Sequence, residues 1–183
     1  MPIATILLLG VVVAATVTDV AVGKIHNWLT YPAIALGFAL IIASGGDGLL
    51  SSAVAVVLAC VGGYVLRRAG AIGGGDIKLI AVIGAFKGLS FMAACLFYSL
   101  AAAAIMGIAL LAWRGKLVDG VRWIFVSAAS RRLPAHTGPD HGLTTMPFAP
   151  AILIGTLCIA YLEFRTGTVD FSWWVGAGAV PHA

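Results

Sequence analysis

The chain has 183 residues, of which 61% are hydrophobic and 10% charged, whereas soluble domains carry about 25% charged residues. Its mean hydropathy of +1.07 indicates an integral membrane protein and excludes an ordinary soluble domain. A net charge of +4 could suggest nucleic-acid binding, but the lysines and arginines are grouped between apolar segments. Such grouping is typical of the cytoplasmic loops of membrane proteins, so we predict no nucleic-acid partner.

A membrane-spanning helix needs about 20 apolar residues, and several segments approach that length. They are continuously apolar rather than alternating, which favours helices over strands. We therefore predict an all-α, polytopic membrane protein in which residues 1–183 form a single domain with about six transmembrane helices. The expected spans are 2–20, 28–44, 49–66, 77 to 86–89, 90–113 and 146–163.

The charges between the spans predict their orientation. Lys24 follows the first span, Arg67 and Arg68 follow the third, and a basic loop at about 114–145 follows the fifth. The turn between the second and third spans contains only Asp47 as a charged residue. By the positive-inside rule, the basic loops lie in the cytoplasm and both termini lie outside.

The basic loop 114–145 has apolar residues at helical spacing between positions 117 and 128. This spacing predicts an interfacial helix on a leaflet of anionic lipid, with an ordinary solvated linker as the alternative. A zinc site built from His136, Asp140 and His141 is conceivable, but two histidines in a polar loop are a weak signal, and we predict no metal.

Asp19 and Asp76 are expected at the cytoplasmic ends of the first and fourth spans, and therefore at one membrane level. Carboxylates near the membrane interior are costly unless they are paired, solvated or protonated. Two carboxyl groups within hydrogen-bonding distance share a proton, so one can activate water while the other polarises a peptide carbonyl. The pair is thus a candidate for aspartyl peptide hydrolysis without a cofactor, and neither residue is assigned as the base.

Gly73, Gly74 and Gly75 precede Asp76 directly. Because they lack side chains, they would allow a substrate backbone to lie against the carboxylates, although a flexible turn is the simpler explanation of a glycine run. The spacing of a phosphate-binding loop is absent. Lys78 is expected to extend its ammonium group toward the lipid headgroups.

These segments resemble the type IV prepilin peptidase family. "GGGD" at 73–76, followed by "IKL", is similar to the family's GxGD motif, and "MPFAPAILIG" at 146–155 is similar to the opening of its last helix. "TDVAVGKIHNWLT" at 18–30 resembles the family's first-aspartate segment, except that His26 stands where the family usually has proline. The matching positions in that segment are Asp19, Lys24, Ile25, Asn27, Trp28 and Leu29.

The resemblance implies a six-helix intramembrane aspartyl protease of the bacterial inner membrane. Such enzymes remove the short basic leader from prepilins or pseudopilins at the cytoplasmic face, and Asp19 and Asp76 would be the catalytic pair. The glycine run, Lys78, Lys24 and Asn27 would be motif residues around the approach of the substrate. The chain resembles the short form of Tad/Flp pilus systems, without the cysteine-containing segment of longer members, so N-methyltransferase activity is not expected.

Three other functions use the same sequence features. A small proton-coupled transporter would use Asp19 and Asp76 as a proton relay. A structural subunit of a secretion or pilus machine would need no catalysis. A GxGD-type protease acting on other transmembrane substrates would share the chemistry and differ in the substrate. Contact between the first and fourth helices, open to the cytoplasmic side, would favour a protease.

Overall fold

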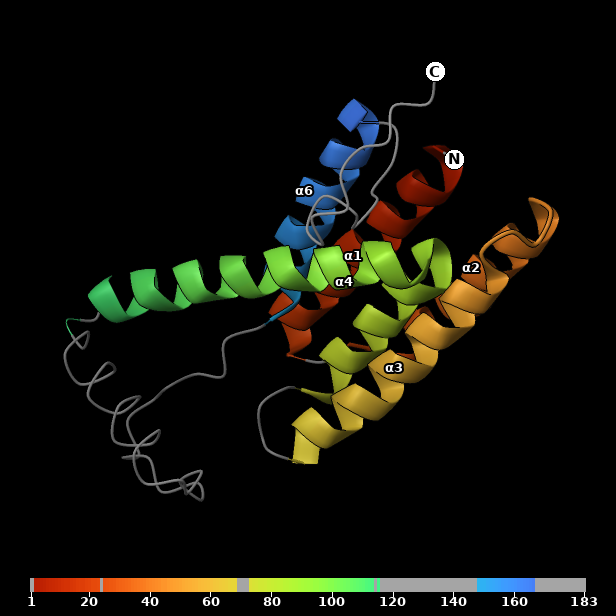
Figure 1. The fold of residues 1–183 in the computed structure, drawn as a ribbon. Coiled ribbons are helices and arrows are strands. Elements are labelled where there is room, and N and C mark those ends of the chain that lie inside the picture. Colours follow the sequence, from red (N-terminus) through yellow and green to blue (C-terminus); the bar gives the residue numbers. More distant parts are fainter. Residues whose placement is uncertain (1, 24, 69–72, 114, 116–147, 167–183) are drawn as a thin grey trace.

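The computed structural model describes residues 2–23, 25–68, 73–113, 115 and 148–166, and within these residues all regular elements are helices. Four of them are long and apolar enough to cross a membrane, and α2 is a shorter apolar helix. The prediction of an all-α, multi-pass membrane protein is therefore confirmed. The helices are α1 (Pro2–Val22), α2 (Asn27–Ala43), α3 (Leu49–Arg68), α4 (Gly74–Trp113) and α6 (Ala149–Thr166) (Figure 1).

Helix α4 contains both the fourth and the fifth predicted spans, which meet at Gly88. This residue has φ 78° and ψ −174°, a backbone conformation open essentially only to glycine. The backbone N–H of Leu89 donates to Ser51 Oγ at 3.0 Å, so a donor near the break is satisfied by α3. The chain turns sharply at this point (Figure 1), and the break lies between the two predicted spans.

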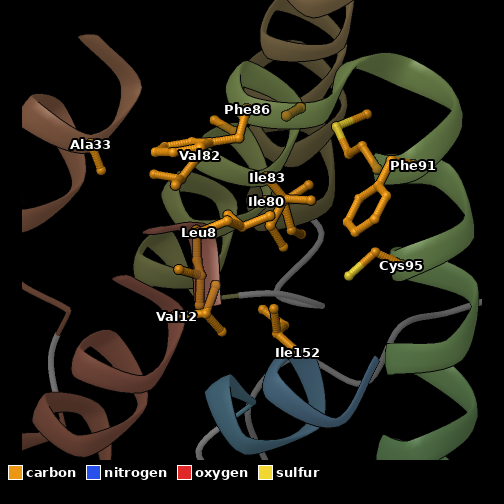
Figure 2. Close-up of a cluster of buried hydrophobic side chains, with 14 of the residues drawn as sticks. Leu8, Val12, Ala33, Ile80, Val82, Ile83, Phe86, Phe91, Cys95 and Ile152 are labelled. Carbon is orange, nitrogen blue, oxygen red and sulfur yellow. The ribbon is translucent and has the colours of Figure 1, made fainter. Parts of the chain in front are cut away.

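The first part of α4, residues 74–87, forms the centre of the helix bundle. Nearly every side chain from Leu79 to Phe86 is buried, and α4 contacts each of the other four described helices. Side chains from α1, α2, α4 and α6 meet around it (Figure 2). A helix segment buried on all sides has no polar face, which explains the uninterrupted apolar sequence from Leu79 to Phe86.

Small residues let the other helices approach α4 closely. A Cβ atom on Gly37 of α2 would lie 2.9 Å from the backbone carbon of Ala85. A Cβ atom on Gly155 of α6 would lie 2.7 Å from the backbone oxygen of Cys95. Helices in a membrane associate largely through van der Waals contact, and glycine permits that contact by bringing two backbones together.

The bundle has two ends, which the hydrogen bonds between α1 and α6 identify. Thr16 Oγ1 donates to the backbone oxygen of Ala149 at 3.4 Å, and Thr5 Oγ1 donates to Glu163 Oε2 at 3.4 Å. The two helices are therefore antiparallel. We call the end where α1 finishes and α4 begins the aspartate end, and the end that contains Glu163 the Glu163 end.

Candidate functional site

The structure brings the two predicted carboxyl groups to the aspartate end. Asp19 lies in the last turn of α1 and Asp76 in the first turn of α4, and both side chains are half-buried. The two helices contact each other, and the charge of Asp19 acts on the Asp76 carboxyl group through space. The prediction from the sequence depends on contact between the first and fourth spans, and the structure contains this contact.

Asp76 also has a structural part in starting α4. The backbone N–H of Gly73 donates to its carboxylate, as in the acidic half of a capping box. A negative charge in the first turn is favoured by the free N–H groups of the helix. Gly74 and Gly75 are therefore helical, and α4 begins one turn earlier than the predicted start at residue 77.

The glycine run is packed by residues of the chain itself. A Cβ atom on Gly75 would lie 3.1 Å from Cβ of Ile25, and one on Gly73 would lie 2.9 Å from Asp76 Oδ2. A Cβ atom on Gly74 would overlap the guanidinium group of Arg67. The glycines thus permit close packing around Asp76, and the approach of a substrate backbone to them stays a prediction.

Sequence reasoning missed the position of Arg67 over Gly74. Arg67 and Arg68 were used only to orient the chain, as a basic pair after the third span. The available signal was that the predicted third span ends seven positions before Gly73, so a long basic side chain can reach across the short connection. The connecting residues 69–72 lie outside the described part of the chain.

Two of the predicted motif residues, Lys78 and Asn27, contact each other. Lys78 Nζ donates to Asn27 Oδ1 and lies 5.9 Å from the centroid of the Tyr31 ring. The Lys78 ammonium group is therefore bound to α2. From the sequence, we had instead predicted that it extends toward the lipid headgroups. Lys24, the remaining motif residue, lies outside the described residues.

His26, which stands where proline was expected, precedes the first turn of α2 without a capping bond from its side chain. Its backbone oxygen accepts from the N–H groups of Leu29 at 3.2 Å and Thr30 at 3.4 Å. Its ring Nδ1 is buried and has no hydrogen-bond partner in the described part of the chain. The backbone therefore maintains the helix start that a proline would favour.

Within the described residues, neither Asp19 nor Asp76 has a lysine or arginine nitrogen within 4.0 Å; the recorded salt bridge joins Lys87 to Glu163. No group of three His, Cys, Asp or Glu side chains among these residues could hold a metal ion. The loop 116–145, with the conceivable zinc ligands, lies outside the described residues. The site is therefore a pair of carboxyl groups without an ion-pair partner among the described residues, an arrangement suited to holding a proton and a water molecule.

The sequence profile of the type IV leader peptidase family matches residues 6–108, a region that includes both aspartates. A prepilin leader peptidase/N-methyltransferase of Bacillus subtilis (strain 168) is 32% identical over 115 residues. The match covers 63% of this chain and 36% of that protein, so the chain spans well under half of its relative. No solved structure matches the chain significantly.

Proposed function

Because the chain belongs to the type IV leader peptidase family, we propose that it is an intramembrane aspartyl endopeptidase that removes the leader from prepilins or pseudopilins. The observation that carries this proposal is the position of Asp19 and Asp76 at one end of the bundle, on two helices in contact and within the region matched by the family. The proposal covers the peptidase reaction alone and does not extend to N-methylation.

In the proposed reaction the ionised member of the pair takes a proton from a water molecule, whose oxygen attacks the scissile carbonyl carbon. The protonated member transfers its proton to the carbonyl oxygen, which becomes a second hydroxyl group of the tetrahedral intermediate. As the C–N bond breaks, the leaving amine of the mature pilin takes up the proton that the first carboxyl group received from water, and a hydroxyl group of the intermediate returns its proton to the second carboxylate. The two carboxyl groups act as a unit, so the roles of base and acid are assigned to the pair.

We place the aspartate end at the cytoplasmic face of a bacterial inner membrane. The positive-inside rule supports this, since Arg67 and Arg68 lie in the last turn of α3, where Arg67 reaches Gly74 at that end, and Lys24 follows the first span in the sequence. Trp28 and Tyr31 at the start of α2 are 70% and 59% exposed, and aromatic residues of this kind are enriched where lipid meets water. Asp19 and Asp76 would then lie at the depth where a prepilin helix leaves the membrane.

The transporter alternative receives less support from the structure. A proton relay needs polar groups leading from the aspartates toward the other face of the membrane. The central segment of α4 that connects Asp76 with the Glu163 end is lined from Leu79 to Phe86 by buried apolar side chains. At that end, Glu163 is bound by the ammonium group of Lys87 and by the hydroxyl group of Thr5.

The test is co-expression of the chain with a prepilin from the same cell, followed by electrophoresis of the prepilin. We expect a shift to the shorter, leaderless form and a new N-terminus at the junction between the basic leader and the apolar helix. Persistence of the full-length precursor, in membranes that contain the inserted chain, would contradict the proposal. A chain with Asp19→Asn and Asp76→Asn is the matched inactive control.

A further inference from the structure

Lys78 lies close to Asp76 in sequence but points away from it. Successive residues of an α-helix are rotated by about 100°, so residues two apart lie on roughly opposite sides of the helix. The Lys78 ammonium group accordingly contacts α2, where it donates to Asn27 Oδ1 and lies over the ring of Tyr31. Its charge is thus directed away from the aspartates by a contact with a different helix.

Asn27 and Tyr31 are four residues apart in α2 and lie on one face of its first two turns. Together they bind the Lys78 side chain: the amide oxygen of Asn27 accepts a hydrogen bond from the ammonium group, and the ring face of Tyr31 lies against its charge. The contact joins the first turns of α4 to the first turns of α2.

The start of α2 is connected to Asp19 by a short segment. The Asp19 carbonyl accepts from the backbone N–H of Gly23 at 2.7 Å, where α1 ends, and α2 begins at Asn27. Between them, the buried side chain of Ile25 lies against Gly75. The segment that follows Asp19 is therefore fixed to α4 on both sides of Asp76, at Gly75 by packing and at Lys78 by a hydrogen bond.

We propose that the Lys78–Asn27 contact is a positioning device that sets the separation of the Asp19 and Asp76 carboxyl groups. Lys78 acts through Asn27 and takes no part in the chemistry. The inference rests on the proposed peptidase function, since it assigns a role within that same site. It differs from a role in binding the substrate, because a cation that binds substrate would change KM, whereas one that aligns the aspartates changes kcat.

The first experiment measures kcat and KM for leader removal by purified variants. Lys78→Met and Asn27→Leu should each lower kcat about tenfold or more with KM unchanged, because small displacements of reacting groups cost large factors in rate. The double variant should be no slower than either single variant, since both remove one contact. Asn27→Asp, which keeps an acceptor for the ammonium group, should retain most of the rate. Unchanged kcat in both single variants, or a rise in KM alone, would overturn the proposal.

A matched control is available on α3. Arg68 Nε donates to the Tyr64 hydroxyl group at 3.2 Å, and the guanidinium carbon lies 5.5 Å from that ring's centroid. This is the same kind of exposed contact between a cation, an acceptor and an aromatic ring, but it lies within one helix. Arg68→Met should therefore leave kcat and KM at their wild-type values. A loss equal to that of Lys78→Met would show a general surface effect and overturn the proposal.

A second experiment separates this inference from the proposed function. In a chain with its three native cysteines replaced by serine, Asp19→Cys and Asp76→Cys are cross-linked with a short bifunctional thiol reagent, without any substrate. Adding Asn27→Leu should slow the cross-link about tenfold, and adding Arg68→Met should not. Because the cysteine variants lack both acids, prepilin cleavage is measured separately with the chain that retains Asp19 and Asp76. Slower cross-linking with Asn27→Leu would support the positioning role even where that chain cleaves no prepilin and the peptidase proposal fails. Unchanged cross-linking, while that chain does cleave prepilin, would overturn the positioning role alone.

Discussion

The two ends of the helix bundle differ in whether their acidic side chains have a cationic partner. At the Glu163 end, Lys87 Nζ contacts both carboxylate oxygens of Glu163 at 2.7 and 2.8 Å, and Thr5 Oγ1 donates to the same carboxylate. The side chains of Lys87 and Glu163 are only 9% and 25% exposed. At the aspartate end, the charge of Asp19 acts on the Asp76 carboxyl group, and no described lysine or arginine nitrogen lies within 4.0 Å of either carboxyl group.

A charge within a membrane protein is costly, and pairing it with the opposite charge reduces that cost. Lys87 and Glu163 follow this rule and connect α4 to α6, so stability alone explains them. Asp19 and Asp76 break the rule, since two like charges close together raise the cost of each. A stable fold gains nothing from such a pair, and an arrangement of this kind is typical of a functional site.

The largest expected effect comes from removing either acid of the aspartate end. Asp19→Asn and Asp76→Asn should each lower leader removal by about 10²–10⁴-fold, because each abolishes the acid–base function of the pair. Both variants should still insert into the membrane. The measurement is the rate of conversion of prepilin at equal amounts of inserted protein.

Asp47→Asn is the control for these variants, because Asp47 is exposed in the turn between α2 and α3. It should cleave at the wild-type rate. Cleavage at that rate by Asp19→Asn or Asp76→Asn would mean that the peptidase does not depend on both acids.

Breaking the ion pair of the Glu163 end should reduce stability and leave the chemistry intact. Glu163→Gln leaves the mostly buried Lys87 ammonium group without its counter-charge, which should lower the free energy of unfolding by about 3–5 kcal/mol. Unfolding in detergent measures this loss, while the rate of cleavage per folded molecule should stay close to wild type.

The exchange of Lys87→Glu with Glu163→Lys should recover part of that stability. Arg165→Gln is the matched control, since Arg165 lies near Glu163 on α6 but is exposed, and it should change stability little. If Glu163→Gln unfolded like the wild type, the pair would not be the helix-joining contact described above.

Gly88→Ala should have a smaller effect on stability. Its φ of 78° strains any other residue, at a cost of about 1–3 kcal/mol, and the added Cβ would lie 2.8 Å from Ser51 Oγ. Gly107→Ala provides the contrast, because Gly107 is helical and its Cβ would meet nothing within 4 Å. That variant should be as stable as the wild type or more so. Equal loss in both variants would argue against a required break at Gly88.

The smallest effect is expected at Gly75. A Cβ atom there would lie 3.1–3.3 Å from the side chain of Ile25, so Gly75→Ala should displace the segment after Asp19 slightly and cost about 1–2 kcal/mol. Gly75→Val should impair leader removal more strongly. Adding Ile25→Val to Gly75→Ala, which shortens the facing side chain, should restore part of the rate. Wild-type cleavage by Gly75→Val would mean that the close packing of Gly75 against Ile25 is not needed for leader removal.

Much of the fold could be predicted because each membrane span is recognisable from its own apolar sequence, without knowledge of its neighbours. The third span was expected at 49–66 and is Leu49–Arg68, and the break between the fourth and fifth spans was expected where Gly88 lies. The start of α4 was placed late because glycine has a low helix propensity. That propensity is overridden by the Asp76 carboxylate, which accepts from the Gly73 N–H.

The pairs of residues that join helices are harder to derive. Lys87 and Glu163 are 76 residues apart in the sequence, and only the packing of α6 on α4 brings them together. Lys78 and Asn27 were expected near the site through the family motifs, and their contact depends on the path of the segment after Asp19. Sequence patterns give the level of a residue in the membrane, while its partner depends on which helices are neighbours.

The most direct test of the account compares Asp76→Asn with Glu163→Gln in one assay of prepilin cleavage, normalised to the amount of folded protein. Asp76→Asn should be folded and produce about 10²–10⁴-fold less mature pilin. Glu163→Gln should be less stable, yet cleave at the wild-type rate per folded molecule. A folded Asp76→Asn variant that cleaves like the wild type would contradict the central claim that the aspartate end is the site of catalysis.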